Sequence, residues 1–129
     1  MMYVEEKKRY YVGLLDDVIH FVFYGDYVEE RGCDDIKFTD AHTAHVFGMM
    51  FWDAIVKDKE GQLWSIHDDV YDLPMFELWR WNGETYSLDD YQCSDDKLHS
   101  ITLSKMDCLK IADALFRASV DLQIKEWAK

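Results

Sequence analysis

The chain has 129 residues, the length of a single domain (1–129), which is enough to bury an ordinary hydrophobic core. Apolar residues make up 49% of it and aromatic residues 16%, which excludes a disordered acidic tail. The formal net charge of −12 disfavours direct contact with nucleic acid or an anionic membrane and favours a basic partner.

The first half of the chain predicts a β-hairpin, a short strand and a helix. Residues 9–15 and 18–24 are rich in β-forming side chains, and the Asp-Asp pair between them suits a turn. The acid-rich stretch that follows predicts a loop or a weak edge strand, and residues 35–38 predict a short strand. Thr39 is expected to cap a helix that runs from about residue 40 to residue 57.

The second half predicts further strands and a second helix. Residues 63–66 form a candidate strand, and residues 75–81 begin a hairpin at Asn82-Gly83, a dipeptide that favours a type I′ turn. A strand over 99–103 is expected to lead to a helix over 105–126, capped by Ser104 with Asp107 at its third position. One apolar stripe of this helix predicts its buried side: Cys108, Ile111, Ala112, Leu115, Ser119 and Leu122, widened by Leu109 and Phe116.

The two halves resemble each other in their order of elements. Residues 9–58 and 75–126 both give a hairpin, a strand and a capped helix, at an offset of 65 residues between Ile36 and Ile101. The sequence therefore predicts an internal duplication and an α+β fold. Its mostly antiparallel strands form one sheet or two related sheets, with both helices on one face.

The first helix is apolar on nearly every side. Phe47, Phe51 and Ile55 are expected to face the core. The remaining apolar side is either buried under other elements or contacts a partner or a second copy of the chain. The residues of this candidate contact are Met49, Trp52 and Val56. Trp79 and Trp81 share one face of the second hairpin, and they are expected in the core of the sheet.

A metal site is the alternative that two histidines suggest. His42 and His45 lie three residues apart on a helix, so they share a face and both reach one ion. A third ligand would have to come from elsewhere, with His67 or Asp68 as candidates. The chain has no HExxH motif, no Gly-rich phosphate loop and no nucleophile elbow. No cofactor is therefore expected, and an enzyme is not the favoured interpretation.

Five adjacent Asp-Asp pairs and dense acidic loops indicate a partner-binding surface. Each pair alone suits a solvated turn, but two acid-rich loops at related positions of the halves would together form a broad negative surface. Tyrosines among the acids would add apolar contact area. The predicted partner-binding residues are Asp26, Tyr27, Glu29, Glu30, Asp34, Asp35, Asp89, Asp90, Tyr91, Asp95 and Asp96.

In size, acidity and layered build the chain resembles small partner-binding proteins. These include phage-encoded inhibitors of host defence enzymes (anti-CRISPR or anti-restriction proteins), toxin-immunity proteins and type III secretion chaperones. The first resemblance implies an inhibitor that mimics nucleic acid and blocks a basic, nucleic-acid-binding enzyme. Immunity or chaperone function, a metal-binding domain and a homodimeric module are the alternatives. Three cysteines without close spacing and the absence of a signal-like apolar run favour the cytoplasm.

Overall fold

The computed structural model describes residues 1–25, 33–67, 74–82, 85–91 and 99–129. These residues form two four-stranded antiparallel sheets and two helices, which confirms the predicted α+β class. In chain order the elements are β1 (Met2–Glu6), β2 (Tyr10–Leu15), β3 (Val18–Tyr24), β4 (Cys33–Phe38), α1 (Ala41–Lys57), β5 (Leu63–His67), β6 (Pro74–Arg80), β7 (Thr85–Asp90), β8 (His99–Ser104) and α2 (Lys105–Trp127).

The strands of each sheet follow one another in chain order, β1-β2-β3-β4 and β5-β6-β7-β8. The predicted turn between β2 and β3 is confirmed, because Asp16 and Asp17 have φ angles of 51° and 61°, as a type I′ turn requires. The sequence does not predict β1, whose two glutamates weaken its β pattern. The first half therefore has four strands where the sequence predicts three.

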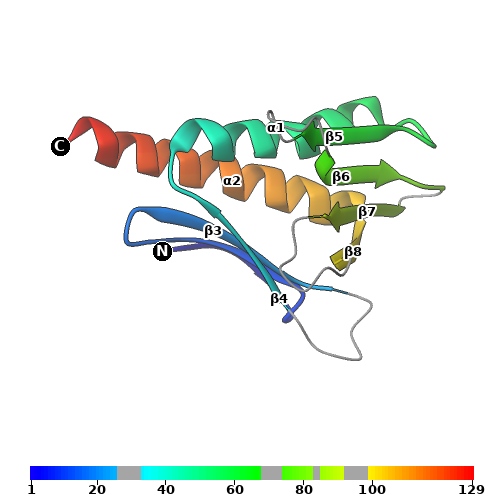
Figure 1. Ribbon diagram of the computed structural model, residues 1–129, viewed down its shortest axis with the longest axis horizontal. Coiled ribbons are helices and arrows are strands. Elements are labelled where there is room, and N and C mark those ends of the chain that lie inside the picture. The colour runs from blue at the N-terminus through cyan, green and yellow to red at the C-terminus, as the bar shows by residue number, and fades with distance from the viewer. Residues whose placement is uncertain (26–32, 68–73, 83–84, 92–98) are drawn as a thin grey trace.

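The two helices lie side by side and run antiparallel (Figure 1). Helix α2 packs on β1, β2 and β3 of the first sheet and on β8, whereas α1 packs on β5 and β6 of the second. Gly48 permits the close approach of the helices, because a Cβ atom there would lie 3.2 Å from Cβ of Leu115 and 3.0 Å from the ring of Phe116. Each helix thus covers part of the sheet from the other half of the chain.

The hydrophobic core joins both sheets through α1. The ring of Phe47 lies 6.1 Å from Phe21 of β3 and 5.2 Å from Phe76 of β6, between ring centroids. Phe51 is fully buried against Phe21, as the sequence predicts for the inner side of α1. The predicted stripe of α2 is buried as well, except for the two residues expected to widen it: Leu109 is exposed and Phe116 is only partly buried.

The helix caps agree with the sequence at α2 and differ by one residue at α1. Ser104 and Asp107 form the predicted capping box. At α1 the cap is Asp40 and not Thr39, because the Asp40 carboxylate accepts a hydrogen bond from the backbone N–H of Thr43 at 2.8 Å. The helices begin 64 residues apart, one fewer than the predicted offset. The order of four strands and a helix occurs twice, and a duplication behind it stays a prediction.

The outer face of β6 carries a tryptophan pair. Trp79 and Trp81 stack with ring centroids 5.6 Å apart, and Trp81 is half exposed. The expectation that both belong to the core of the sheet is therefore wrong. The opposite face of β6 is buried instead, with Phe76 against α1. Arg80 is tolerated on that buried face because the carboxylate of Asp58 pairs with its guanidinium.

Candidate functional site

The first candidate site lies where β4 of one sheet meets β8 of the other. Nδ1 of His99 lies 2.5 Å from Oδ1 of Asp34, and this contact is an ion pair when the imidazole is protonated. Asp34 closely follows the acid-rich segment 26–32, and His99 directly follows the acid-rich segment 92–98, both outside the described residues. The flanks of both segments are therefore neighbours. We call this region the acidic edge: Asp34, Asp35, Asp89, Asp90, Tyr91 and His99.

Three aspartates of the acidic edge are buried. Asp34, Asp89 and Asp90 expose 8%, 9% and 6% of their surface. The sequence predicts these residues on an open partner-binding surface, whereas the structure buries them. Asp34 shares its face of β4 with the buried Phe38, and the consecutive Asp89 and Asp90 lie on opposite faces of β7. Ser100 Oγ donates a hydrogen bond of 2.6 Å to Asp89, and burial raises the pKa of the Asp89 carboxyl group.

We expect Asp89→Asn to raise the free energy of unfolding at neutral pH by about 1 kcal/mol, because it removes a buried charge but keeps an acceptor for Ser100. The raised pKa means that the folded state binds the Asp89 proton more tightly than the unfolded state does. The wild type should therefore gain stability as pH falls toward the ordinary aspartate pKa, and the variant should not gain this increment. Urea unfolding at neutral pH and near pH 5 measures the difference. If the variant were less stable than the wild type by the same amount at both pH values, the prediction would be wrong.

Two predicted members of the acidic edge are exposed. The carboxylate of Asp35 contacts Nδ1 of His20 at 3.0 Å. The hydroxyl group of Tyr91 donates a hydrogen bond of 3.1 Å to Glu77, and partial burial together with this bond raises the pKa of Tyr91 to about 12. The other predicted partner-binding residues lie outside the described residues: Asp26, Tyr27, Glu29, Glu30, Asp95 and Asp96.

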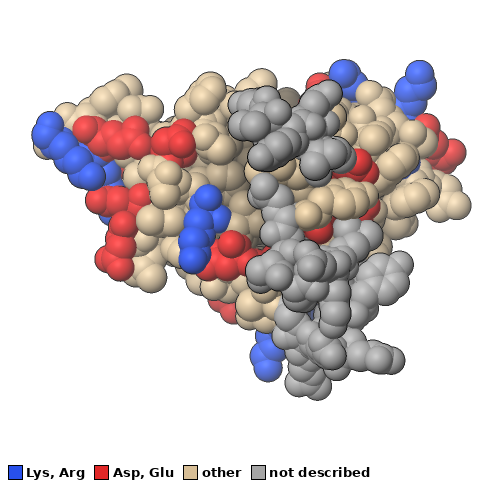
Figure 2. Space-filling model, viewed as in Figure 1, with Lys and Arg blue, Asp and Glu red and all other residues tan. Residues whose placement is uncertain are grey.

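The negative charge of the chain is unevenly distributed along the sequence. The four segments outside the described residues carry nine acidic and two basic residues, more than half of the net charge of −12. In the described part, many carboxylates have a cationic neighbour. Figure 2 shows red and blue side chains together at the end of the molecule near the C-terminus, where Lys125 and Lys129 each lie 3.4 Å from Asp17. The excess of acid is therefore concentrated in the connections between strands.

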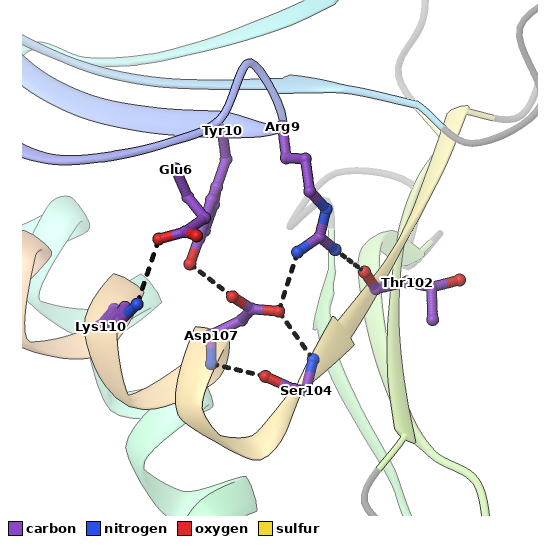
Figure 3. Close-up of polar contacts among 7 residues, drawn as sticks. All are labelled: Glu6, Arg9, Tyr10, Thr102, Ser104, Asp107 and Lys110. Atoms are coloured by element: carbon purple, nitrogen blue, oxygen red, sulfur yellow. Dashed lines mark hydrogen bonds and ion pairs between the residues drawn. The ribbon is translucent and has the colours of Figure 1, made fainter.

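A second polar cluster joins the first turn of α2 to the first sheet (Figure 3). The Asp107 carboxylate accepts hydrogen bonds from the Tyr10 hydroxyl at 2.7 Å, from the Ser104 backbone N–H at 2.9 Å and from the Arg9 guanidinium at 3.1 Å. Arg9 also donates to the carbonyl oxygen of Thr102. Burial alone would raise the pKa of Asp107, but these hydrogen bonds hold it below its ordinary value.

A third polar cluster lies at the same end of the helix pair, where α1 ends and α2 begins. Asp58, which ends α1, accepts hydrogen bonds from Arg80 and Tyr86 at 2.7 Å each and from Lys105 at 2.9 Å. The bonds from these three groups hold the pKa of Asp58 well below its ordinary value. In the second and third clusters the carboxylate oxygens are occupied by groups of the same chain. Both clusters therefore fasten helix ends to the sheets.

The second candidate site is the outer side of the two helices. Met49, Trp52 and Val56 of α1, predicted as a partner or subunit contact, are 50%, 48% and 63% exposed. Helix α2 continues this surface, because the ring of Phe116 lies 5.2 Å from that of His45 at the seam between the helices. We call this surface the helix face: Val46, Met49, Trp52, Val56, Leu109, Phe116, Val120, Ile124 and Trp127.

A hollow of about 330 Å³ opens at one end of the helix face. His42 and His45 line it together with Val120, Ile124 and Trp127, so the two histidines do lie together. Of the third ligands considered for a metal ion, His67 ends β5 and Asp68 lies outside the described residues. Within the described ranges, no group of three or more His, Cys, Asp or Glu side chains is close enough to hold an ion.

Comparisons of the chain with family models, with curated proteins and with solved structures find no match. In the part of the chain that the structure describes, neither helix has both the length and the apolar character needed to cross a bilayer. The acidic edge and the helix face are the surfaces from which a function can be argued.

Proposed function

We propose that this protein acts by binding another protein rather than by catalysis, and that its partner presents a basic surface. The observation that carries the proposal is the contact between Asp34 and His99, which makes the flanks of two acid-rich segments neighbours. The two segments that flank this contact in the sequence, 26–32 and 92–98, hold five acidic and two basic residues. Charge of one sign around one edge attracts a partner of the opposite sign and speeds its association.

The partner class that fits this charge is an enzyme with a nucleic-acid-binding groove. Such a groove exchanges counterions for phosphate anions, and a surface rich in carboxylates offers the same exchange. Tyr91, half exposed beside these acids, adds the apolar contact that charge alone lacks. The proposed function is inhibition of a basic nucleic-acid-binding enzyme by mimicry of its ligand, as an anti-defence protein would do in the cytoplasm of a host.

Charge reversal at Asp35 of the acidic edge and at Glu30 of the adjoining segment 26–32 tests this proposal. In Glu30→Lys/Asp35→Lys, we expect about tenfold slower association with a partner captured from a host lysate, because the steering field is weakened. Asp34 is left unchanged because it is buried. The lysate is passed over immobilised wild type and variant, and the retained proteins are quantified by mass spectrometry. Association rates are then measured with the purified partner.

The matched control reverses two acids away from the edge, Glu60 before β5 and Glu126 near the end of α2, in Glu60→Lys/Glu126→Lys. This variant has the same net charge as the test variant, so it separates a local surface from the charge of the whole protein. The proposal requires the control to bind the partner faster than the test variant does. Equal association rates for the two variants would show that the edge is not the contact.

A further inference from the structure

We propose that the helix face is the interface of a symmetric homodimer, in which a second copy of this chain covers it. Its exposed apolar side chains come from both helices and meet at the seam, where Phe116 lies against His45. Helices of the lengths of α1 and α2 extend about 25 Å and about 35 Å, and two helices side by side are about 20 Å wide. The face therefore has a footprint of about 600 Å², at the lower end of the range of about 600–1,000 Å² that each partner buries in a standard interface.

The charges on the helix face favour a second copy over a basic partner. Asp53 pairs with Lys57 at 3.2 Å, and Asp113 pairs with Arg117 at 3.0 Å, each four residues further along its helix. The face is therefore neutral in a protein whose net charge is −12. These acids are already paired, so a basic partner gains no additional ion pair with them. Two copies of the chain, in contrast, meet there without repulsion between like charges.

The shape of the helix face sets the orientation of the two copies. The hollow lies at the end that carries His45 and Ile124, and the exposed Trp52 lies on the other side of the close helix crossing at Gly48. A two-fold axis that lies in the plane of the face, perpendicular to the helices, places the hollow end of one copy against the Trp52 end of the other. Trp52 of one copy then enters the hollow of the other, and the four helices form a bundle.

Sedimentation velocity of the purified protein tests the dimer. We expect a dimer at about 10 μM for the wild type, and a dissociation constant raised about 30-fold or more by Trp52→Asp or by Ile124→Asp. The control is Leu15→Asp, which places the same charge at an exposed apolar residue of β2 and should leave the dimer intact. Far-UV circular dichroism confirms that each variant is folded. A monomeric wild type, or equal weakening by Leu15→Asp, overturns the proposal.

Disulfide formation between two variants tests the orientation. In a background with Cys33→Ser and Cys93→Ser, a mixture of Trp52→Cys and Val120→Cys chains should form a mixed disulfide faster than either variant alone. Faster cross-linking of Trp52→Cys with itself would refute the proposed axis.

The dimer should also persist at high salt, because its interface carries no net charge. Loss of the dimer at high salt would instead assign self-association to the charged surfaces.

Discussion

Replacing Asp107 with alanine is expected to lower the free energy of unfolding by about 3 kcal/mol. The reason is that one carboxylate joins the first turn of α2 to the first sheet, with hydrogen bonds from Tyr10, Arg9 and the backbone of Ser104. Its removal leaves the buried hydroxyl group of Tyr10 without this acceptor and removes half of the capping box. Urea unfolding followed by circular dichroism measures the change.

Asp113→Ala is the matched control, because Asp113 is an exposed aspartate of the same helix whose partner is Arg117, four residues on. Its loss should cost less than about 0.5 kcal/mol. Equal effects of the two substitutions would show that the cluster around Asp107 contributes little. The lowered pKa of Asp107 gives a second check: its contribution is fully present above the ordinary aspartate pKa and disappears as pH falls through the folded-state value. The difference between Asp107→Ala and the wild type should therefore shrink in acid.

Replacing Phe51 with alanine is expected to lower the free energy of unfolding by about 4 kcal/mol. Phe51 is fully buried, with its ring 6.2 Å from Phe21 of the first sheet and 5.7 Å from Phe47 of the same helix. Truncation opens a cavity between α1 and the first sheet, and the rings of Phe21 and Phe47 can move to fill only part of it. The measurement is again urea unfolding, at a fixed protein concentration.

Tyr24→Ala serves as the control for the loss of an aromatic ring, because Tyr24 is 41% exposed at the end of β3. Its truncation should cost about 1 kcal/mol or less. If Phe51→Ala costs no more than this control, the inner side of α1 is not the centre of the core.

Local patterns predict those parts of the fold that local chemistry determines. The turn at Asp16-Asp17, the capping box at Ser104 and the buried stripe of α2 all follow from short-range rules and agree with the structure. The one-residue error at α1 arises because Thr39 and Asp40 are both good caps, and only the backbone geometry selects Asp40.

Contacts between distant parts of the chain could not be predicted from the sequence. The alternation of side chains in β6 is compatible with burial of either face. The face that carries Phe76 is buried because it packs against α1, which leaves the tryptophans on the outer face. The bond between Arg9 and Asp107 joins residues that are 98 positions apart, and it exists only because α2 docks on the sheet of the other half. Similarly, Asp89 and Asp90 look like solvated loop acids in the sequence, but they belong to β7, where they lie on opposite faces and are both buried.

The most direct test of the central claim is the salt dependence of the association rate between this protein and the basic partner that it captures. Binding through an acidic surface predicts a rate that falls steeply, about tenfold or more, between low and physiological ionic strength. The rate for Glu30→Lys/Asp35→Lys should fall much less. A rate that does not change with salt, or that changes equally in wild type and variant, would contradict the claim and assign the negative charge to solubility alone.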